Sequence, residues 1–402
     1  MNQQKYTIKD KDFWKIVCSL GAASFFIFAT MYCMQPILPI FTKDFDISIS
    51  YASLSMSLST VGLIIGLIVI GFLSDRKGRT LFIHLSIIST TILLFIIPLM
   101  ESFTLIVFFR FIQGFTLAGV SGAALAYMVE EIDRKHFGFA TTLYIASNSA
   151  GGMMGRFITG FVAESFSWQT ALYILGVFGV IIFLFGFFTL PKSKYFTEST
   201  RLFMEDIAGL LYHFKNPSLL LMFGLGIVLQ TSFTGMWTFL PFHLLEAPYN
   251  LTLQQISYFY FAYSLGVVGA PIAGWLVGRF SLSTMRVAGV IILSAGMFIV
   301  LGTSLLAIIL GLGIICLGFF VSHSLTTATV SQEATHHKGS ASSLYLVAYY
   351  IGVSAGTTLL VPIWETFAWQ GIVLFAAILP VVYVAIVKIL QTKLKRRAES
   401  SV

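Results

Sequence analysis

The stretch GFLSDRKGRT, residues 71–80, is a short charged turn between two long apolar runs. One run ends near Phe72 and the next begins near Leu81. About 20 consecutive apolar residues are enough to cross a bilayer as a helix. The stretch therefore predicts a tight loop that joins two membrane helices.

The apolar character of these two runs extends along the whole chain. Of the 402 residues, 57% are hydrophobic and 10% are charged, and the mean hydropathy is +0.89. A soluble domain carries about 25% charged residues. The composition predicts an all-α polytopic membrane protein. Cys18, Cys33 and Cys316 lie in apolar runs without metal-ligand spacing, so we expect no metal, cofactor or disulfide.

Twelve apolar runs predict twelve transmembrane helices. The first six cover residues 14–40, 52–73, 80–100, 103–127, 138–163 and 168–190. The last six cover residues 217–241, 252–278, 284–303, 305–330, 339–363 and 369–390. We therefore expect an N-terminal six-helix bundle at 1–190, a central cytoplasmic loop at 191–216, and a C-terminal bundle with a basic tail at 217–402.

The distribution of basic residues predicts the orientation of these helices. Of 24 Lys and Arg residues, Lys43 falls in a predicted outer loop and Arg110 and Arg156 fall inside predicted spans. The others lie on the side of the two termini. Basic loops stay in the cytoplasm, so we expect a multi-pass protein of the cell membrane with both termini cytoplasmic. The net charge of +7 then reflects topology and contacts with anionic lipid, and no nucleic-acid partner is expected.

The two halves contain an internal repeat. When the sequence is shifted by 201 positions, residues 138–169 align with 339–370 without a gap. The shared residues include the glycine pairs Gly151/Gly155 and Gly352/Gly356 and a Trp-Gln pair at the start of the sixth span of each half. Two copies of one six-helix bundle favour a carrier with a central substrate path that opens to one side at a time.

With this layout, the turn at 71–80 resembles the loop signature of the major facilitator superfamily. A second stretch, Arg110-Phe-Ile-Gln113-Gly114, resembles the Arg-x-x-Gln-Gly motif of the fourth helix in that family. The resemblance implies two pseudo-symmetric six-helix bundles. The glycine-rich stretch 148–155 and the sequence of the first span resemble the bacterial drug and sugar efflux branch of proton antiporters. The fifth helix of that branch carries a Gly-Pro pair, which this sequence does not have at the corresponding place.

The resemblance also implies a gate at the turn. Arg76 and Arg79 are expected to pair with Glu130, Glu131 or Asp133 at the end of the fourth span. An alternative is a solvated basic turn that only sets the topology. The gating residues implied by the resemblance are Gly71, Asp75, Arg76, Gly78, Arg79 and Glu130.

Two arginines lie inside predicted spans. A cation in the hydrocarbon region is costly unless it faces a cavity or a partner. Helix carbonyls, Tyr32 and Gln35, or an anionic substrate are possible partners of Arg110 and Arg156. A structural brace to carbonyls, or to Glu164 in the case of Arg156, is the alternative to substrate binding.

By resemblance, the substrate path is lined mainly by spans one, four, seven and ten, with contributions from spans five and eleven. Tyrosines in such helices also serve as packing or as an interfacial belt. The expected substrate-binding residues are Tyr32, Gln35, Arg110, Gln113, Asn148, Arg156, Gln230, Trp237, His323 and Tyr349.

Proton coupling is expected to use a titratable side chain. His323 lies well inside a predicted span and histidine changes charge near neutral pH, although structural hydrogen bonding is the alternative. Glu130 and Glu131 lie at the predicted cytoplasmic rim and are further proton-coupling candidates.

The leading functional hypothesis is a secondary active transporter that exports a small organic solute or drug, driven by protons. An organic-anion exchanger or uptake carrier using Arg110 and Arg156, and a lipid flippase on the same fold, are alternatives. The sequence has no HExxH, no GxSxG and no paired intramembrane carboxylates, so we do not expect an enzyme. The expected partners are a small-molecule substrate, protons and membrane lipid, and the protein is expected to act as a monomer.

Overall fold

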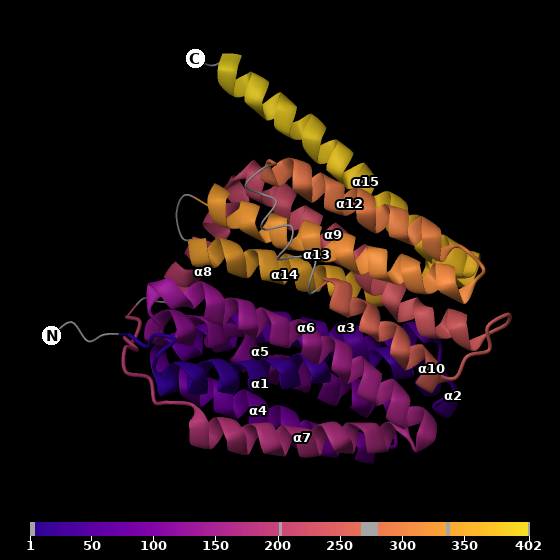
Figure 1. Ribbon diagram of the computed structural model, residues 1–402, viewed down its shortest axis with the longest axis horizontal. Coiled ribbons are helices and arrows are strands. Elements are labelled where there is room, and N and C mark those ends of the chain that lie inside the picture. The colour runs from indigo at the N-terminus through magenta and orange to yellow at the C-terminus, as the bar shows by residue number, and fades with distance from the viewer. Residues whose placement is uncertain (1–4, 201–202, 267–279, 335–337, 401–402) are drawn as a thin grey trace. The chain divides into compact units, whose positions relative to one another are not determined.

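The computed structural model describes residues 5–200, 203–266, 280–334 and 338–400, and its ribbon is drawn in Figure 1. The chain divides into two compact units. Unit 1 contains Met1–Arg201 together with Leu244–Phe261, and unit 2 contains Leu202–His243 and Ala262–Val402. Within the described residues, regular structure is helical apart from one isolated bridge between Tyr6 and Ile132. The expected all-α fold class is confirmed.

Unit 1 is built from long helices that follow the first six predicted spans. The first span is broken, because the helix ends at Tyr32 and two prolines, Pro36 and Pro39, prevent its simple continuation. The helices of the first 201 residues are α1 (Lys11–Tyr32), η1 (Gln35–Ile37), α2 (Leu38–Asp44), α3 (Ile49–Lys77), α4 (Arg79–Ile96), η2 (Ile97–Leu99), α5 (Phe103–Glu131), α6 (Arg134–Ser165) and α7 (Trp168–Thr189).

The rest of the chain repeats this arrangement of long helices. Its elements are α8 (Phe203–Tyr212), η3 (His213–Lys215), α9 (Pro217–Leu245), α10 (Leu253–Ser257), η4 (Tyr258–Ala262), α12 (Leu282–Val300), α13 (Leu305–Glu333), α14 (Lys338–Thr358) and α15 (Val361–Ser400). Helix α15 contains a non-helical residue at Ala368, where the predicted loop before the twelfth span lies.

Nine segments within the described ranges are long and apolar enough to cross a membrane. They coincide with predicted spans one to four, six, seven, nine, ten and twelve. The fifth and eleventh predicted spans are the long helices α6 and α14, which are richer in small and polar residues. Part of the eighth predicted span, residues 267–278, lies outside the described residues.

Glycines of α6 bring it close to α1. A methyl group added at Gly151 would overlap the backbone of Phe25, and one at Gly155 would overlap the backbone of Ala29. Small residues at this spacing let helix backbones approach, and this is how helices gain packing contacts in lipid. The pair therefore fixes α1 against α6.

The repeated glycines of α14 do the same in unit 2. A methyl group at Gly352 would overlap the backbone of Ile227 in α9, and one at Gly356 would overlap the backbone of Thr231. The sequence repeat thus encodes one packing contact in each half, between the first and fifth spans of that half.

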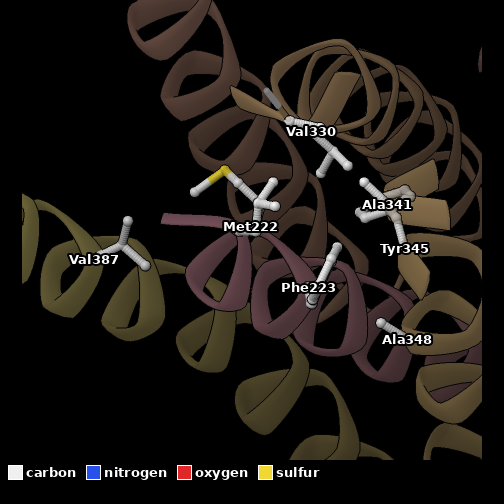
Figure 2. Packing of buried hydrophobic residues seen from close by; sticks show 9 residues of the cluster. Met222, Phe223, Val330, Ala341, Tyr345, Ala348 and Val387 are labelled. Atoms are coloured by element: carbon white, nitrogen blue, oxygen red, sulfur yellow. The ribbon is translucent and has the colours of Figure 1, made fainter. Parts of the chain in front are cut away.

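Figure 2 shows buried side chains of a hydrophobic cluster in unit 2. The cluster joins α9, α13, α14 and α15 through small and large apolar side chains. Its members are Leu219, Met222, Phe223, Val330, Ala334, Ala341, Tyr345, Ala348 and Val387. Ala341 and Tyr345 belong to the sequence repeat, and their counterparts Ala140 and Tyr144 are also buried.

Candidate functional site

The turn between α3 and α4 depends on a glycine with a positive backbone angle. Gly78 has φ 99° and its backbone N–H donates to the carbonyl of Ser74 at 3.2 Å. Only glycine adopts this region without a steric penalty. Gly78 therefore ends α3 and lets α4 begin at the next residue.

Arg79 is the centre of a small network at this turn. Its guanidinium pairs with the carboxylate of Asp75 and with Glu130 Oε1 at 3.1 Å, and it donates to Ser74 Oγ at 3.0 Å. The side chains of Arg79 and Glu130 are 12% and 20% exposed, whereas that of Asp75 is 39% exposed. The predicted pairing of Arg79 with Glu130 is confirmed.

The other predicted gating residues lie beside this network. Arg76 donates to the carbonyl of Phe72 at 3.0 Å, and its guanidinium lies 3.4 Å from the centre of the Phe72 ring. A methyl group at Gly71 would meet no neighbouring atom within 4 Å. Gly71 is therefore not required for close packing in this conformation.

Glu131, the next residue after Glu130, is fully buried and faces a different segment. Its Oε1 accepts hydrogen bonds from Ser193 Oγ at 2.6 Å and from the backbone N–H groups of Lys194 at 2.7 Å and Tyr195 at 3.0 Å. The two adjacent carboxylates thus bind different partners.

Arg110 is completely buried and hydrogen-bonded to protein groups. Nε donates to the carbonyl of Ser55 at 3.1 Å, and Nη2 donates to the carbonyl of Met31 at 3.0 Å. Nη1 donates to the carbonyl of Thr30 at 3.2 Å and to Gln113 Oε1 at 2.5 Å. This is the carbonyl brace that the sequence left open as an alternative for Arg110.

The break in the first span explains why these carbonyls are available. Because α1 ends at Tyr32, its last carbonyls lack the usual helical donors. They also form the negative end of the helix dipole, which favours a cation. Arg110 therefore stabilises the break, and the break in turn places Tyr32 at the end of α1 and Gln35 beyond it.

Tyr32 and Gln35 meet Arg156 of α6. Arg156 Nε donates to Gln35 Oε1 at 2.5 Å, and Nη1 donates to the carbonyl of Gly152 at 2.7 Å. The guanidinium lies 4.0 Å from the centre of the Tyr32 ring and 5.9 Å from that of Tyr260. Arg156 is 3% exposed. The structure thus brings three predicted substrate-binding residues together in one cationic, aromatic cluster, which we call the Arg156 cluster.

Asn148 lies on the same face of α6, two turns before Arg156. It is half-buried, and its Oδ1 accepts a hydrogen bond from Ser24 of α1. Asn148 therefore ties α6 to α1 beside the Arg156 cluster.

Residues 253–261 pack against α6 and contact the Arg156 cluster. Glu164 Oε2 accepts the backbone N–H of Leu253 at 3.1 Å, and the Phe157 ring lies 4.9 Å from that of Phe261. This segment supplies Tyr260, which is fully buried. Tyr260 was not predicted from the sequence, because its contact with Arg156 joins positions far apart in the chain.

In unit 2, His323 of α13 lies among aromatic rings. Its Nδ1 is 2.9 Å from the Tyr345 hydroxyl, and its ring centre is 4.9 Å from that of Tyr349 and 5.6 Å from that of Phe319, to which it is parallel. Two predicted residues, His323 and Tyr349, are therefore in contact. We call this group the His323 cluster.

The His323 cluster continues to α9 through stacked rings. Phe319 stacks on Phe233 with centres 3.9 Å apart, and Phe233 lies 6.3 Å from Trp237. About two turns before Trp237, Gln230 Nε2 donates to Thr234 Oγ1 at 2.9 Å. Gln230 Oε1 is buried and has no hydrogen-bond partner among the described residues. This acceptor is a candidate contact for a donor group of a ligand.

Arg286 is a buried cation, although it was predicted to be a cytoplasmic charge. It is 4% exposed, and its Nη1 donates to Thr329 Oγ1 at 2.8 Å. Its position inside the predicted span 284–303 was the signal that could have identified it.

Comparison with known proteins agrees with this architecture. The family model of the Major Facilitator Superfamily matches residues 20–357. The chain belongs to the major facilitator superfamily. An uncharacterized transporter of Buchnera aphidicola subsp. Schizaphis graminum is 34% identical over 369 residues, covering 92% of this chain and 89% of the relative. The inner membrane transport protein YnfM of Escherichia coli is 31% identical over 385 residues, covering 96% of this chain and 91% of the relative.

This major facilitator protein also resembles solved structures. A D-xylose-proton symporter superposes with a TM-score of 0.74 at 14% identity, covering 92% of this chain and 96% of the other. At this identity the likeness shows the fold alone. The family and its relatives are transporters, so this protein is a membrane transporter and not an enzyme.

Proposed function

We propose that this transporter exports a small organic solute or drug by alternating access and that protons drive the export. The observation that carries the proposal is the His323 cluster, where a histidine is held among stacked rings and hydrogen-bonded to Tyr345. Aromatic faces bind ring-containing solutes by stacking, and an imidazole exchanges protons near neutral pH. The D-xylose-proton symporter has the same fold, so the fold is compatible with proton coupling.

The test uses purified protein in sealed vesicles with a pH dye inside and an imposed pH gradient. A panel of sugars and ring-containing drugs is added, and proton movement that depends on one of them supports antiport. His323→Gln should abolish this movement. The matched control is His84→Gln, because His84 also lies in a membrane helix and contacts the rings of Phe183 and Phe187. A solute flux that does not change with the pH gradient would contradict proton coupling.

A second candidate is an organic-anion exchanger or uptake carrier. The Arg156 cluster favours it, because the buried guanidinium donates to neutral acceptors, Gln35 and the Gly152 carbonyl, which an anionic group could replace. Arg110 was part of the same hypothesis, and its four hydrogen bonds to protein groups favour the brace instead. Arg156→Gln should weaken the transport of organic anions in the vesicle assay and leave neutral solutes unaffected.

We propose that the turn at 71–80 is the gate that controls access from the cytoplasm. The Arg79 network supports this role, since it holds Asp75 and Glu130 together at one end of unit 1. Glu130 exchanges its proton as this network opens and closes. We also propose that the protein acts as a monomer in the cell membrane with both termini in the cytoplasm, as the positions of its basic residues favour.

A further inference from the structure

We propose that residues 191–199 form a strap across the gating turn and that Glu131 is the positioning residue that holds this strap in place. The strap begins directly after α7, at the start of the predicted central loop. It has no regular secondary structure, yet it makes specific contacts with α5, with the α3–α4 turn and with the N-terminal segment. The proposal rests on the gating role proposed for the turn.

Glu131 anchors the first part of the strap. All three hydrogen bonds that it accepts from Ser193, Lys194 and Tyr195 converge on Oε1. One turn earlier on α5, the Tyr127 hydroxyl donates to the carbonyl of Pro191 at 2.6 Å. A buried carboxylate that accepts several N–H groups is a strong anchor, because each bond has a charged acceptor.

The far part of the strap reaches the gating turn itself. The Phe196 ring centre lies 5.9 Å from the guanidinium carbon of Arg79, and the backbone N–H of Ser199 donates to the carbonyl of Asp75 at 2.9 Å. Arg79 is the residue that pairs with Asp75 and Glu130. Phe196 thus lies over the centre of the network.

The exposure of the strap agrees with these contacts. Its half-buried positions are Pro191, Ser193, Tyr195, Phe196 and Ser199, each of which makes a contact described above or contacts the N-terminal segment. The side chains between them are exposed, namely Lys192, Lys194, Thr197 and Glu198. This pattern is that of a chain lying on a surface with one side toward it.

The N-terminal segment fixes the same junction from a second direction. The backbone N–H of Tyr6 donates to the carbonyl of Glu131 at 2.9 Å, and that of Asp133 donates to the carbonyl of Tyr6 at 2.9 Å. Lys194 Nζ lies 4.9 Å from the centre of the Tyr6 ring. Glu131 therefore joins three segments through its side chain and its backbone.

This arrangement gives Glu131 a role different from the proton carrier that the sequence suggested. Glu131 supplies a charged acceptor oxygen to the strap, and glutamine would keep the oxygen without the charge. The turn cannot rearrange without changing its contacts with Phe196 and Ser199, so the strap holds the closed network of Arg79. Its release would expose Arg79 to water and weaken the ion pairs.

The experiment measures amide hydrogen exchange by mass spectrometry on the full-length protein in lipid nanodiscs, which requires no substrate. The variants are Glu131→Ala, Glu131→Gln and Phe196→Ala, and Glu198→Ala is the matched control on an exposed carboxylate of the strap. We expect Glu131→Ala to speed exchange in peptides covering 193–199 and 74–80 by about 10- to 100-fold. Glu131→Gln should speed exchange less than Glu131→Ala, because the amide keeps an acceptor oxygen but loses the charge. Glu198→Ala should exchange like the wild type.

Phe196→Ala tests the same link without altering a buried group, and it should speed exchange in 74–80 while leaving Lys194 and Tyr195 protected. The proposal is overturned if releasing the strap leaves exchange at 74–80 unchanged, or if Glu131→Gln behaves like Glu131→Ala. Fast exchange of residues 193–199 in the wild type would also overturn it. If amide exchange followed these expectations but the wild type moved no protons in the vesicle assay, the result would count against the proposed function alone.

Discussion

At the scale of single residues, two neighbouring carboxylates and two buried arginines perform different tasks. Glu130 pairs with Arg79 while Glu131 accepts from backbone N–H groups. Arg110 is enclosed by carbonyls, whereas Arg156 lies between a glutamine and an aromatic ring. Residue type alone does not separate these roles, because Glu131 accepts from backbone N–H groups and Arg110 donates to backbone carbonyls, and almost every residue carries both groups.

Replacing Arg110 by Gln should lower the free energy of unfolding by about 3 kcal/mol, because the carbonyls at the end of α1 lose a charged donor in a buried place. Arg110→Lys should recover only part of this loss, since an ammonium cannot reproduce the fork of the guanidinium. Thermal unfolding in detergent, followed by tryptophan fluorescence, measures both. Arg76→Gln is the control, with an expected cost of about 1 kcal/mol or less. An unchanged melting temperature for Arg110→Gln would contradict the brace and favour substrate binding by Arg110.

Gly78→Ala should destabilise the protein by about 1–2 kcal/mol, because φ 99° is strained for any residue with a Cβ. Gly71→Ala is a matched control seven residues earlier, where a methyl group meets no neighbour and the backbone is helical. That change should be neutral or slightly stabilising, since alanine favours helix. Melting temperatures that fall equally in the two variants would contradict this account of the turn.

At the scale of elements, the sequence predicted the helices well and their contacts less well. Span boundaries follow from charged turns such as 71–80, which water must reach, so they are visible in the sequence. The contact between Arg156 and Tyr260 was not predictable, because it depends on how a distant segment packs on α6. The repeat did carry packing information, since its glycines mark the α1–α6 and α9–α14 contacts.

Gly155→Ala should cost about 1–3 kcal/mol of stability, because the added methyl overlaps the backbone of Ala29 and forces α1 and α6 apart. Gly138→Ala, in the same helix, adds a methyl that meets no atom within 4 Å and should have little effect. Both are compared by thermal unfolding and by the fraction of monodisperse protein after purification. If Gly155→Ala were as stable as Gly138→Ala, close packing of these helices would not be required.

At the scale of the whole molecule, most of the basic residues fall in the predicted loops on the side of the two termini. Lys43 is the basic residue of the predicted outer loops. This asymmetry and the twelve-span layout predicted the topology, and the resemblance to the family came from the loop signature at 71–80 and the motif at 110–114. The substrate was not predictable, because the candidate contacts are side chains that also occur as ordinary helix packing.

Topology can be tested with reporter fusions in a bacterial host. A fluorescent protein joined after Val402 should fold and fluoresce, because it stays in the cytoplasm, whereas alkaline phosphatase joined there should be inactive. The same phosphatase joined after Asp46, in the predicted outer loop, should be active. Phosphatase activity at the C-terminus would reverse the predicted orientation.

The segment Leu244–Phe261 has a consequence for how the protein is assembled. It is encoded after the first six spans, yet it packs in unit 1, where Leu253 and Phe261 contact α6. A fragment that stops at Arg201 would therefore leave the Phe157 side of α6 uncovered and should be prone to aggregation. If the chain were divided after Arg201 and both fragments were produced in one cell, the second fragment would supply Leu244–Phe261. We expect the two fragments to assemble and the first to remain soluble in detergent. Folding of unit 1 is thus completed only after Leu244–Phe261 has been synthesised.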